Sequence, residues 1–408
     1  MWILISVGFI FLSFMLSIYL LFRQKRQIES AEHPPEVFKD EYTNEEFLSA
    51  KSYEHDRIKF RIVCNLIDTV ESLISLFVFA KLWNFTRYGS ETVHSILFTL
   101  LASFLMFLLG IPISYFSKFV IEEKHGFNKS TIKLFLTDLI KSLGLQIVLI
   151  IILIPILLFI YRKSGTRFVL YGAIFFLVFS ILLQLIFPVF ILPLFTKLTP
   201  LEDGEVKDSV NKLAREYGFP VSELYVSDDS KRSSKQNAMV FGLFKKKIAF
   251  ADTLLGKCNA EEITAIVGHE IGHSKHKHIV KMMVLSQLSI ILTLSLLYYI
   301  MKTPSVFIDF GFESEQPFLI GMVICGFLSM PIDTLLSLPI NMLMRYFEFQ
   351  ADTFASSKGL RIDNALIKIG KENKVAIDPD PLYSAFENSH PTLQQRVTKA
   401  REILKKLE

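Results

Sequence analysis

Long apolar segments alternate with polar segments along the chain. Several of the apolar segments approach or exceed the roughly 20 residues that a helix needs to cross a ~30 Å hydrocarbon layer, and most of them hold almost no charge. The pattern predicts membrane-spanning helices at residues 2–22, 60–83, 93–116, 143–161, 168–195, 279–301 and 318–344. The predicted fold class is therefore an all-α polytopic membrane protein with seven transmembrane helices.

The segments differ in how strongly the sequence supports them. The fourth and fifth are the clearest, because their apolar stretches contain no charged residue. The second is weaker, because Arg61, Asp68 and Glu71 lie inside it. Charges within a span usually face a polar cavity or pair with a partner. Asp68, Glu71 and Asp333 therefore indicate a polar interior among the helices, unless the span boundaries are misplaced and these residues lie near an interface.

Basic residues after the first segment set the predicted orientation. This segment is longer than the ~7–15-residue core of a signal peptide and follows no basic region, so it is expected to remain as an uncleaved span. Arg23, Lys25 and Arg26 follow it and place residues 23–59 in the cytosol, with the N-terminus on the lumenal side. The loops around residues 117–142 and 196–278 and the C-terminal tail then also face the cytosol, while the loop at residues 302–317 lies outside. One short loop, residues 162–167, carries basic residues on the predicted outer side.

Two polar segments carry the predicted elements outside the membrane. In residues 196–278, a small α+β unit, we expect a helix at Asp208–Tyr217 ended by Gly218, a strand at Leu224–Val226, a hairpin of Met239–Leu243 and Lys247–Ala251, and a helix at Glu261–His278. The tail contains a Pro-rich loop at Asp378–Pro381 and a final helix at Thr392–Leu407. The chain thus divides into residues 1–195, 196–278, 279–344 and 345–408.

Composition excludes several classes of protein. The chain has 408 residues, of which 51% are hydrophobic, and this argues against a soluble enzyme, a disordered scaffold and a secreted disulfide-rich module. A net charge of +4 is small for this length and indicates no nucleic-acid partner. Cys64, Cys258 and Cys325 are far apart, so we expect neither a disulfide framework nor a Cys-rich metal site.

The sharpest motif is His269-Glu270-Ile271-Gly272-His273. Positions i and i+4 of a helix lie on one face, so both imidazoles can reach one metal ion. Glu270 projects beside them and can accept a proton from a metal-bound water, which is the chemistry of H-E-x-x-H zinc peptidases. A solvated helix end with ordinary histidines is the alternative interpretation, since His276 and His278 follow directly.

A catalytic zinc usually has three protein ligands, and Glu348 is the best candidate for the third. Asp352 follows one turn later on the same predicted helix face and can orient a ligand histidine through its ring N–H. Two spans separate His273 from Glu348, so both return to one side of the membrane, as a shared metal requires. The alternative is an acidic helix at the interface that binds no metal.

Two further segments carry candidate substrate contacts. Asn237 and Ala238 open the predicted hairpin, and an exposed strand edge near a zinc site can bind an extended peptide by backbone pairing. A purely structural hairpin explains them equally well. In the tail, His390 and Arg396 lie near a helix start. His390 can donate a hydrogen bond to the oxyanion of a tetrahedral intermediate, although a histidine in this position is often only a cap residue.

Taken together, the chain resembles the type I CAAX prenyl proteases, integral-membrane zinc peptidases of the endoplasmic reticulum. The resemblance covers nearly the whole chain and is carried by the order of its motifs. They are His33-Pro34-Pro35, the stretch Glu123–Ser130, Asn237-Ala238, His269–His273, Glu348–Asp352, and His390-Pro391 with Arg396. Met344 and Thr392 depart from the usual family residues, and neither is a proposed ligand.

The resemblance implies seven helices around a large chamber, with a zinc site in a cytosol-facing cap. It implies one Zn²⁺ per chain and removal of the last three residues from prenylated Cys-a-a-X proteins. By position, the ligands would be His269, His273 and Glu348, and the base would be Glu270. Asp352 would orient a ligand, while Asn237, Ala238, His390 and Arg396 would contact substrate or the intermediate.

Two other functions remain open on the sequence alone. A membrane quality-control zinc protease of broader specificity shares the motif, but such proteases have fewer spans. A transporter with an inactive metal site is the alternative from another class, with Asp68, Glu71 and Asp333 along its pathway. The expected partners are a prenylated substrate and the lipid bilayer.

Overall fold

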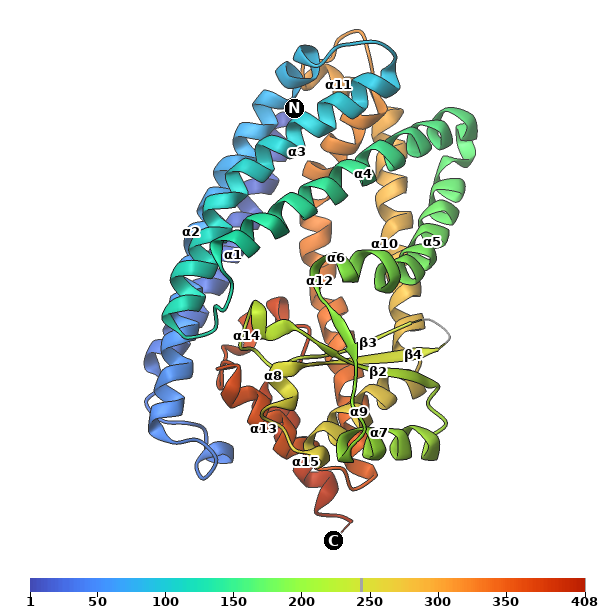
Figure 1. The fold of residues 1–408 in the computed structure, drawn as a ribbon. Helices are drawn as coiled ribbons and strands as arrows, with labels where there is room; N and C mark the ends of the chain where they lie inside the picture. The colour runs from blue at the N-terminus through green and yellow to red at the C-terminus, as the bar shows by residue number, and fades with distance from the viewer. Residues whose placement is uncertain (243–244, 408) are drawn as a thin grey trace.

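The computed structural model describes residues 1–242 and 245–407. Long helices make up most of the chain, and a four-stranded sheet lies with shorter helices at one end of them (Figure 1). The N-terminus lies at the end of the helical part that is far from the sheet, and the C-terminus lies beyond the sheet (Figure 1). The molecule is therefore divided along its length into an apolar helical part and a polar part.

The long helices occupy the predicted spans. They are α1 (Trp2–Ser30), α2 (Asn44–Phe85), α3 (Glu91–Phe116), α4 (Ile132–Ser164), α5 (Phe168–Ile186), α10 (His278–Met301) and α12 (Phe318–Ser357). Six stretches among the described residues are long and apolar enough to cross a membrane, with Ile132–Phe195 taken as one. That stretch turns at Gly165, whose φ is +52°, and α4 and α5 pack against each other. The chain is a multi-pass membrane protein.

Two helices run well past the apolar segments that predict them. α2 begins at Asn44, where Thr43 and Glu46 form a capping box. α12 continues to Ser357, beyond the predicted end at residue 344. Hydropathy marks only the part of a helix that lies in lipid, so it gives the position of such a helix but not its full length. The extension of α12 carries Glu348 and Asp352 into the polar part.

The sheet has the strand order β1-β2-β4-β3. Its strands are β1 (Leu198–Pro200), β2 (Val221–Ser227), β3 (Ala238–Phe241) and β4 (Lys246–Ala251). β3 and β4 pair antiparallel as the predicted hairpin, although Leu243 lies outside the described residues. β2 pairs parallel with β4 and antiparallel with β1. β3 is therefore an edge strand.

Shorter helices pack around this sheet or connect the longer elements. They are α6 (Leu192–Phe195), α7 (Glu205–Glu216), α8 (Asp252–Leu255), α9 (Ala260–Lys275), α11 (Pro304–Asp309), α13 (Ile362–Glu372), α14 (Pro381–Glu387) and α15 (Leu393–Leu404). One buried core joins Ile248 and Phe250 of β4 to Ile263, Val267 and Ile271 of α9. The apolar stripe of α9 therefore faces this core.

The structure corrects two predicted helix ends and adds two helices. The helix expected at Glu261–His278 ends at Lys275, because Lys277 is left-handed with a φ of +54° and α10 begins at His278. The final helix ends at Leu404 rather than Leu407. The tail also holds α13 and α14, which were not predicted, and the Pro-rich loop leads directly into α14, with Pro381 in its first turn and Asp380 as its N-cap.

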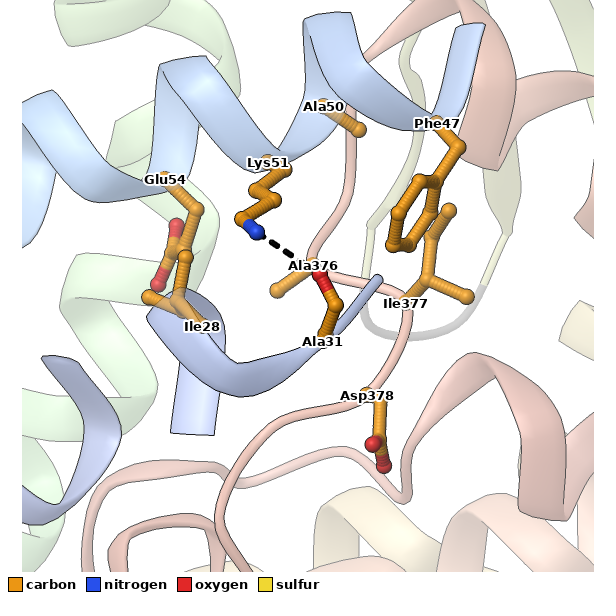
Figure 2. A pocket seen from close by; sticks show the side chains of 9 residues that line it. All are labelled: Ile28, Ala31, Phe47, Ala50, Lys51, Glu54, Ala376, Ile377 and Asp378. Carbon is orange, nitrogen blue, oxygen red and sulfur yellow. Dashed lines mark hydrogen bonds between the residues drawn. The ribbon is translucent and has the colours of Figure 1, made fainter. Parts of the chain in front are cut away.

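The C-terminal tail returns to the first two helices. Arg23 of α1 forms an ion pair of 2.9 Å with Asp380. The ammonium of Lys51 on α2 donates a hydrogen bond of 2.7 Å to the backbone oxygen of Ala31, and the nearby tail residue Ile377 packs against Phe47 (Figure 2). The ion pair between Arg23 and Asp380 and the packing of Ile377 against Phe47 attach the tail to the membrane helices.

α9 and α12 approach each other very closely. A Cβ atom added at Gly272 would lie 2.8 Å from the Cα of Ala351, which is closer than real Cβ atoms come to backbone. At Gly268 an added Cβ would lie 2.3 Å from the side chain of Leu360. The two helices can therefore reach this spacing only because α9 has glycine where it crosses α12.

We expect Gly272→Ala to destabilise the polar part, because its methyl group would push α9 away from the backbone of α12. Overpacking of this kind costs about 1–3 kcal/mol. Thermal unfolding of the purified protein in detergent measures the effect as a lower Tm. Gly144→Ala is the matched control, since nothing lies within 4 Å of its added Cβ in helix α4. An unchanged Tm for Gly272→Ala would contradict the close helix contact.

Candidate metal centre

Three potential metal ligands meet where α9 crosses α12. The Nε2 atoms of His269 and His273, one turn apart on α9, lie 3.0 Å from each other. Glu348 places Oε1 3.2 Å from Nε2 of His273 and Oε2 3.6 Å from Nε2 of His269. One ligand atom from each residue lies within 4.8 Å of the others. The structure thus brings together the three side chains that the sequence predicts as ligands.

Asp352 fixes the ring of His269. It is fully buried one turn after Glu348 and lies 2.8 Å, through Oδ1, from Nδ1 of His269. A carboxylate in this position accepts a hydrogen bond from Nδ1–H, which leaves the Nε2 lone pair of His269 directed at the other two ligands. The structure thus places Asp352 against the predicted ligand His269.

Arg396 of α15 holds Asp352 in turn. Its Nε and Nη2 donate two hydrogen bonds of 2.8 Å to the two oxygens of Asp352, and Nη2 lies 3.4 Å from Glu348. Burial disfavours its charge, but Asp352, Glu348 and Glu270 outweigh burial and raise the pKa of Arg396. Arg396 therefore remains a cation, and its donors serve Asp352 rather than an open substrate site.

Glu270 lies beside the ligands, half-buried on α9. Burial disfavours the charged form of His273, but a hydrogen bond with Glu348 and the charges of Glu348 and Glu270 raise its pKa. The charge of Glu270 also contributes to the raised pKa of Arg396. Glu270 therefore lies near enough to His273 and Arg396 for its charge to favour their charged forms.

His390 reaches the ligand group from the C-terminal tail. Its Nδ1 lies 2.9 Å from Oε2 of Glu348, while 60% of its side chain is exposed. Arg345 of α12 fixes the preceding loop through hydrogen bonds from Nη1 to three backbone oxygens. They belong to Ser384, Ala385 and Asn388, at 3.2, 3.1 and 2.8 Å. His390 is therefore held at the centre but remains accessible from outside it.

Asn237 directly precedes the edge strand β3, and Ala238 is the first residue of that strand. Asn237 is exposed, and its backbone oxygen accepts a hydrogen bond of 3.0 Å from Ala251. Ala238 pairs with Phe250 of β4. Within the described part of the chain, neither residue contacts the metal ligands. Their outer edge is open to an added strand.

The sequence suggested for His278 only the place of an ordinary histidine after the motif. Its Nδ1 lies 2.9 Å from Nδ1 of His273, on the side of the ring away from Glu348, and its Nε2 lies 3.0 Å from Gln350. His278 also stacks on Phe347, with ring centroids 4.2 Å apart. His278 therefore contacts Nδ1 of His273, just as Asp352 contacts Nδ1 of His269. The left-handed turn at Lys277, which hydropathy does not reveal, brings it there.

The donor set fits a catalytic zinc ion. Two imidazole nitrogens and one carboxylate are the ligands of a common class of zinc peptidase sites, which keep a further position open. At least one imidazole has its second nitrogen bound to a buried carboxylate, as zinc-binding histidines usually do. His390 and Glu270 lie around the same point without being needed as ligands.

Comparisons with known proteins match both parts of the chain. Residues 24–197 match a family model described as CAAX prenyl protease N-terminal, five membrane helices. Residues 200–404 match the model of peptidase family M48, a metallopeptidase family.

Curated relatives and a solved structure match nearly the full length. CAAX prenyl protease 1 of Saccharomyces cerevisiae is 36% identical, and the alignment covers 97% of this chain and 94% of the relative. The human CAAX prenyl protease 1 homolog is 33% identical over 93% of this chain and 91% of its own. The crystal structure of S. mikatae Ste24p matches with a TM-score of 0.94 and 36% identity, covering 98% of this chain and 99% of that one.

We expect Glu348→Ala to lose most of its bound zinc, because two histidines alone hold the ion much more weakly than three ligands. Elemental analysis of protein purified in detergent measures zinc per chain. Glu261→Ala is the control and should retain zinc, since Glu261 is exposed on the first turn of α9 and is not among the three ligands. Stoichiometric zinc in Glu348→Ala would instead identify another third ligand, such as His276 or His278.

Proposed function

The chain belongs to peptidase family M48 and to its CAAX prenyl proteases, and on this premise we propose that it removes the last three residues from prenylated Cys-a-a-X proteins at the endoplasmic reticulum membrane. It is a metallopeptidase. One observation carries the substrate: similarity to the yeast CAAX protease covers 97% of this chain, so the membrane helices are shared along with the peptidase part. This chain therefore shares with that relative both the helices that would surround a lipidated substrate and the part that carries the catalytic residues.

The proposed cofactor is one Zn²⁺ per chain, held by His269, His273 and Glu348. When bound, zinc supplies a Lewis acid and lowers the pKa of a water molecule from 15.7 towards ~7. Asp352 keeps His269 in the tautomer that can bind the ion. Arg396 acts through Asp352 as a positioning residue, because it donates two hydrogen bonds of 2.8 Å to that carboxylate.

Glu270 is the proposed general base. It takes the proton of the attacking water and passes it to the nitrogen of the departing tripeptide, so that the peptide bond breaks without leaving an amide anion. His390 donates a hydrogen bond to the oxygen that becomes negative during the attack. Its exposed ring and its contact with Glu348 support this role.

The proposed substrate contact is the free edge of β3. A peptide that adds to this strand through backbone hydrogen bonds would pass Asn237 and Ala238, and the side chain of Asn237 can bond to the peptide. Backbone pairing is tolerant of side chains, which suits a substrate class whose a-a-X residues vary. The membrane helices would then bind the prenyl group of the substrate.

The proposed membrane arrangement has seven crossings around a chamber, with the N-terminus in the lumen and the metal centre and C-terminus facing the cytosol. The turn at Gly165 between α4 and α5 supports this count. Residues 1–195 and 279–344 would form the membrane part. Residues 196–278 and 345–408 would form the cap, with Asp68, Glu71 and Asp333 among the helices.

We expect Glu270→Gln to bind zinc normally and to lose at least about a hundredfold in kcat, because general-base catalysis contributes typically 10²–10⁴-fold. Turnover of a farnesylated peptide and zinc content are measured on the same preparation. Glu261→Gln, an exposed position on the first turn of α9, is the control and should keep its activity. Retained activity with full zinc in Glu270→Gln would remove Glu270 from the mechanism.

The purified protein should cleave a farnesylated Cys-a-a-X peptide much faster than the same peptide without the lipid. Mass spectrometry should show release of the intact tripeptide. Equal cleavage of both peptides, or cuts at many positions, would indicate a broad membrane quality-control protease. No cleavage of either peptide by zinc-loaded protein would contradict the proposed peptidase function.

A further inference from the structure

A polar pocket opens beside the metal ligands, between α2, the segment before β3 and the C-terminal tail. Its volume is about 460 Å³. His390 forms part of its lining and also contacts Glu348. His390 therefore connects the pocket to the metal centre, and the lining extends from His390 to Arg61 on α2. No step of the proposed mechanism uses this pocket.

Cations outnumber carboxylates among the lining residues. The charged side chains there are Arg57, Arg61, Lys235, Lys374, Glu54 and Glu387. Arg57 pairs with Glu54 at 2.9 Å, and Arg61 pairs with Glu387 at 2.5 Å. Lys235 pairs at 2.9 Å with Glu122, which lies behind the lining. Within the described chain, these pairs leave the charge of Lys374 without an opposing carboxylate.

Lys374 is held in place without being neutralised. Its backbone is left-handed, with a φ of +49°, directly after α13 ends. Its ammonium donates a hydrogen bond of 2.9 Å to the backbone oxygen of His125 and lies 5.4 Å from the ring centre of Phe127. The ammonium of Lys235 lies 4.7 Å from the same ring. The ammonium groups of two lining residues thus lie over the same ring, that of Phe127.

The strand edge directs the substrate's C-terminal end toward this pocket. Antiparallel pairing is slightly more stable per residue than parallel pairing. A peptide added antiparallel to β3 runs with its C-terminus toward the start of β3, where Lys235 precedes Asn237. Three extended residues span at most roughly 10 Å. The end of an a-a-X tripeptide would therefore lie in the pocket that opens at His390.

We propose that this pocket binds the C-terminal carboxylate of the substrate, with Lys374 as its principal cation and Lys235, Arg57 and Arg61 around it. The proposal rests on the proposed function, because it assigns the end of that substrate to a place. A carboxylate accepts charge-assisted hydrogen bonds from ammonium and guanidinium groups, which are stronger than neutral ones. The carboxylate of the substrate would balance the charge of Lys374, which has no partner among the ion pairs of the lining.

Such a site explains how the enzyme counts three residues. Backbone pairing on β3 is the same at every register, so it does not select a scissile bond. A cation at a fixed distance from the metal ligands does select one, because only a chain that ends three residues beyond the cut can reach both. The register would then be measured from the C-terminus of the substrate.

Two farnesylated peptides that differ only at the C-terminus test the proposal on the full-length, zinc-loaded protein. One ends in a free carboxylate and the other in a carboxamide. We expect kcat/KM to be at least about tenfold higher for the carboxylate, the effect of a hydrogen bond between charged groups. The free tripeptide should likewise inhibit more strongly than its amide, which tests binding without catalysis.

Variants assign the effect to the pocket. Lys374→Gln should bring the carboxylate-to-carboxamide ratio close to one, while Lys374→Arg, which keeps the charge, should retain most of it. Lys399→Gln is the matched control, because Lys399 is half-exposed on α15 and pairs with Glu402 outside the pocket. Its ratio should equal that of the unaltered protein. If Lys374→Gln does not fold, Lys235→Gln should lower the ratio in the same direction.

The outcomes separate the two proposals. Equal cleavage of both prenylated peptides by the unaltered protein would overturn the carboxylate site and leave the proposed function intact. A Lys374→Gln variant that loses activity equally on both peptides would also overturn the site. If zinc-loaded protein cleaves neither prenylated peptide, the proposed function fails first, and the carboxylate site falls with it.

Discussion

The close contact of α9 with α12 is the constraint on which the rest of the structure depends. Because Gly272 has no side chain, its backbone lies so close to that of Ala351 that an added Cβ atom would not fit between them. At that spacing, His269 and His273 of one helix face Glu348 of the other across a few ångströms. Any larger side chain at the crossing would separate the ligands, whatever their chemistry.

Charge balance then joins a third element to this pair of helices. Asp352 and Glu348 are buried carboxylates, and burying them uncompensated would be costly. Arg396 from α15 meets both of them, so the C-terminal tail completes the centre rather than merely covering it. The same tail contacts α1 through Asp380 and delivers His390 through the loop that Arg345 holds. The C-terminal tail therefore connects the membrane helices α1 and α12 to the metal centre.

Local patterns in the sequence account for a large part of this fold. Apolar runs locate the long helices, the two short β-rich runs predict the hairpin, and Gly218 with its φ of +59° ends α7 as expected. Spacing alone brings His269 and His273 to one face of α9. Elements whose signal is short or non-local were missed. β1 has three residues and a proline, and the left-handed Lys277 has no hydropathy signature. The strand predicted at Leu224–Val226 is confirmed within β2, but its parallel pairing with β4 was not predicted.

The sequence by itself determined that the chain crosses a membrane several times, that it carries an H-E-x-x-H helix, and that Glu348 returns to the same side as His273. These features follow from hydropathy and helical period, which are local properties. Tertiary structure alone decided that Arg396 faces Asp352, that His278 lies behind His273, and that a cationic pocket begins at His390. Each of these contacts joins residues from separate elements, and only the packing of those elements brings the residues into contact.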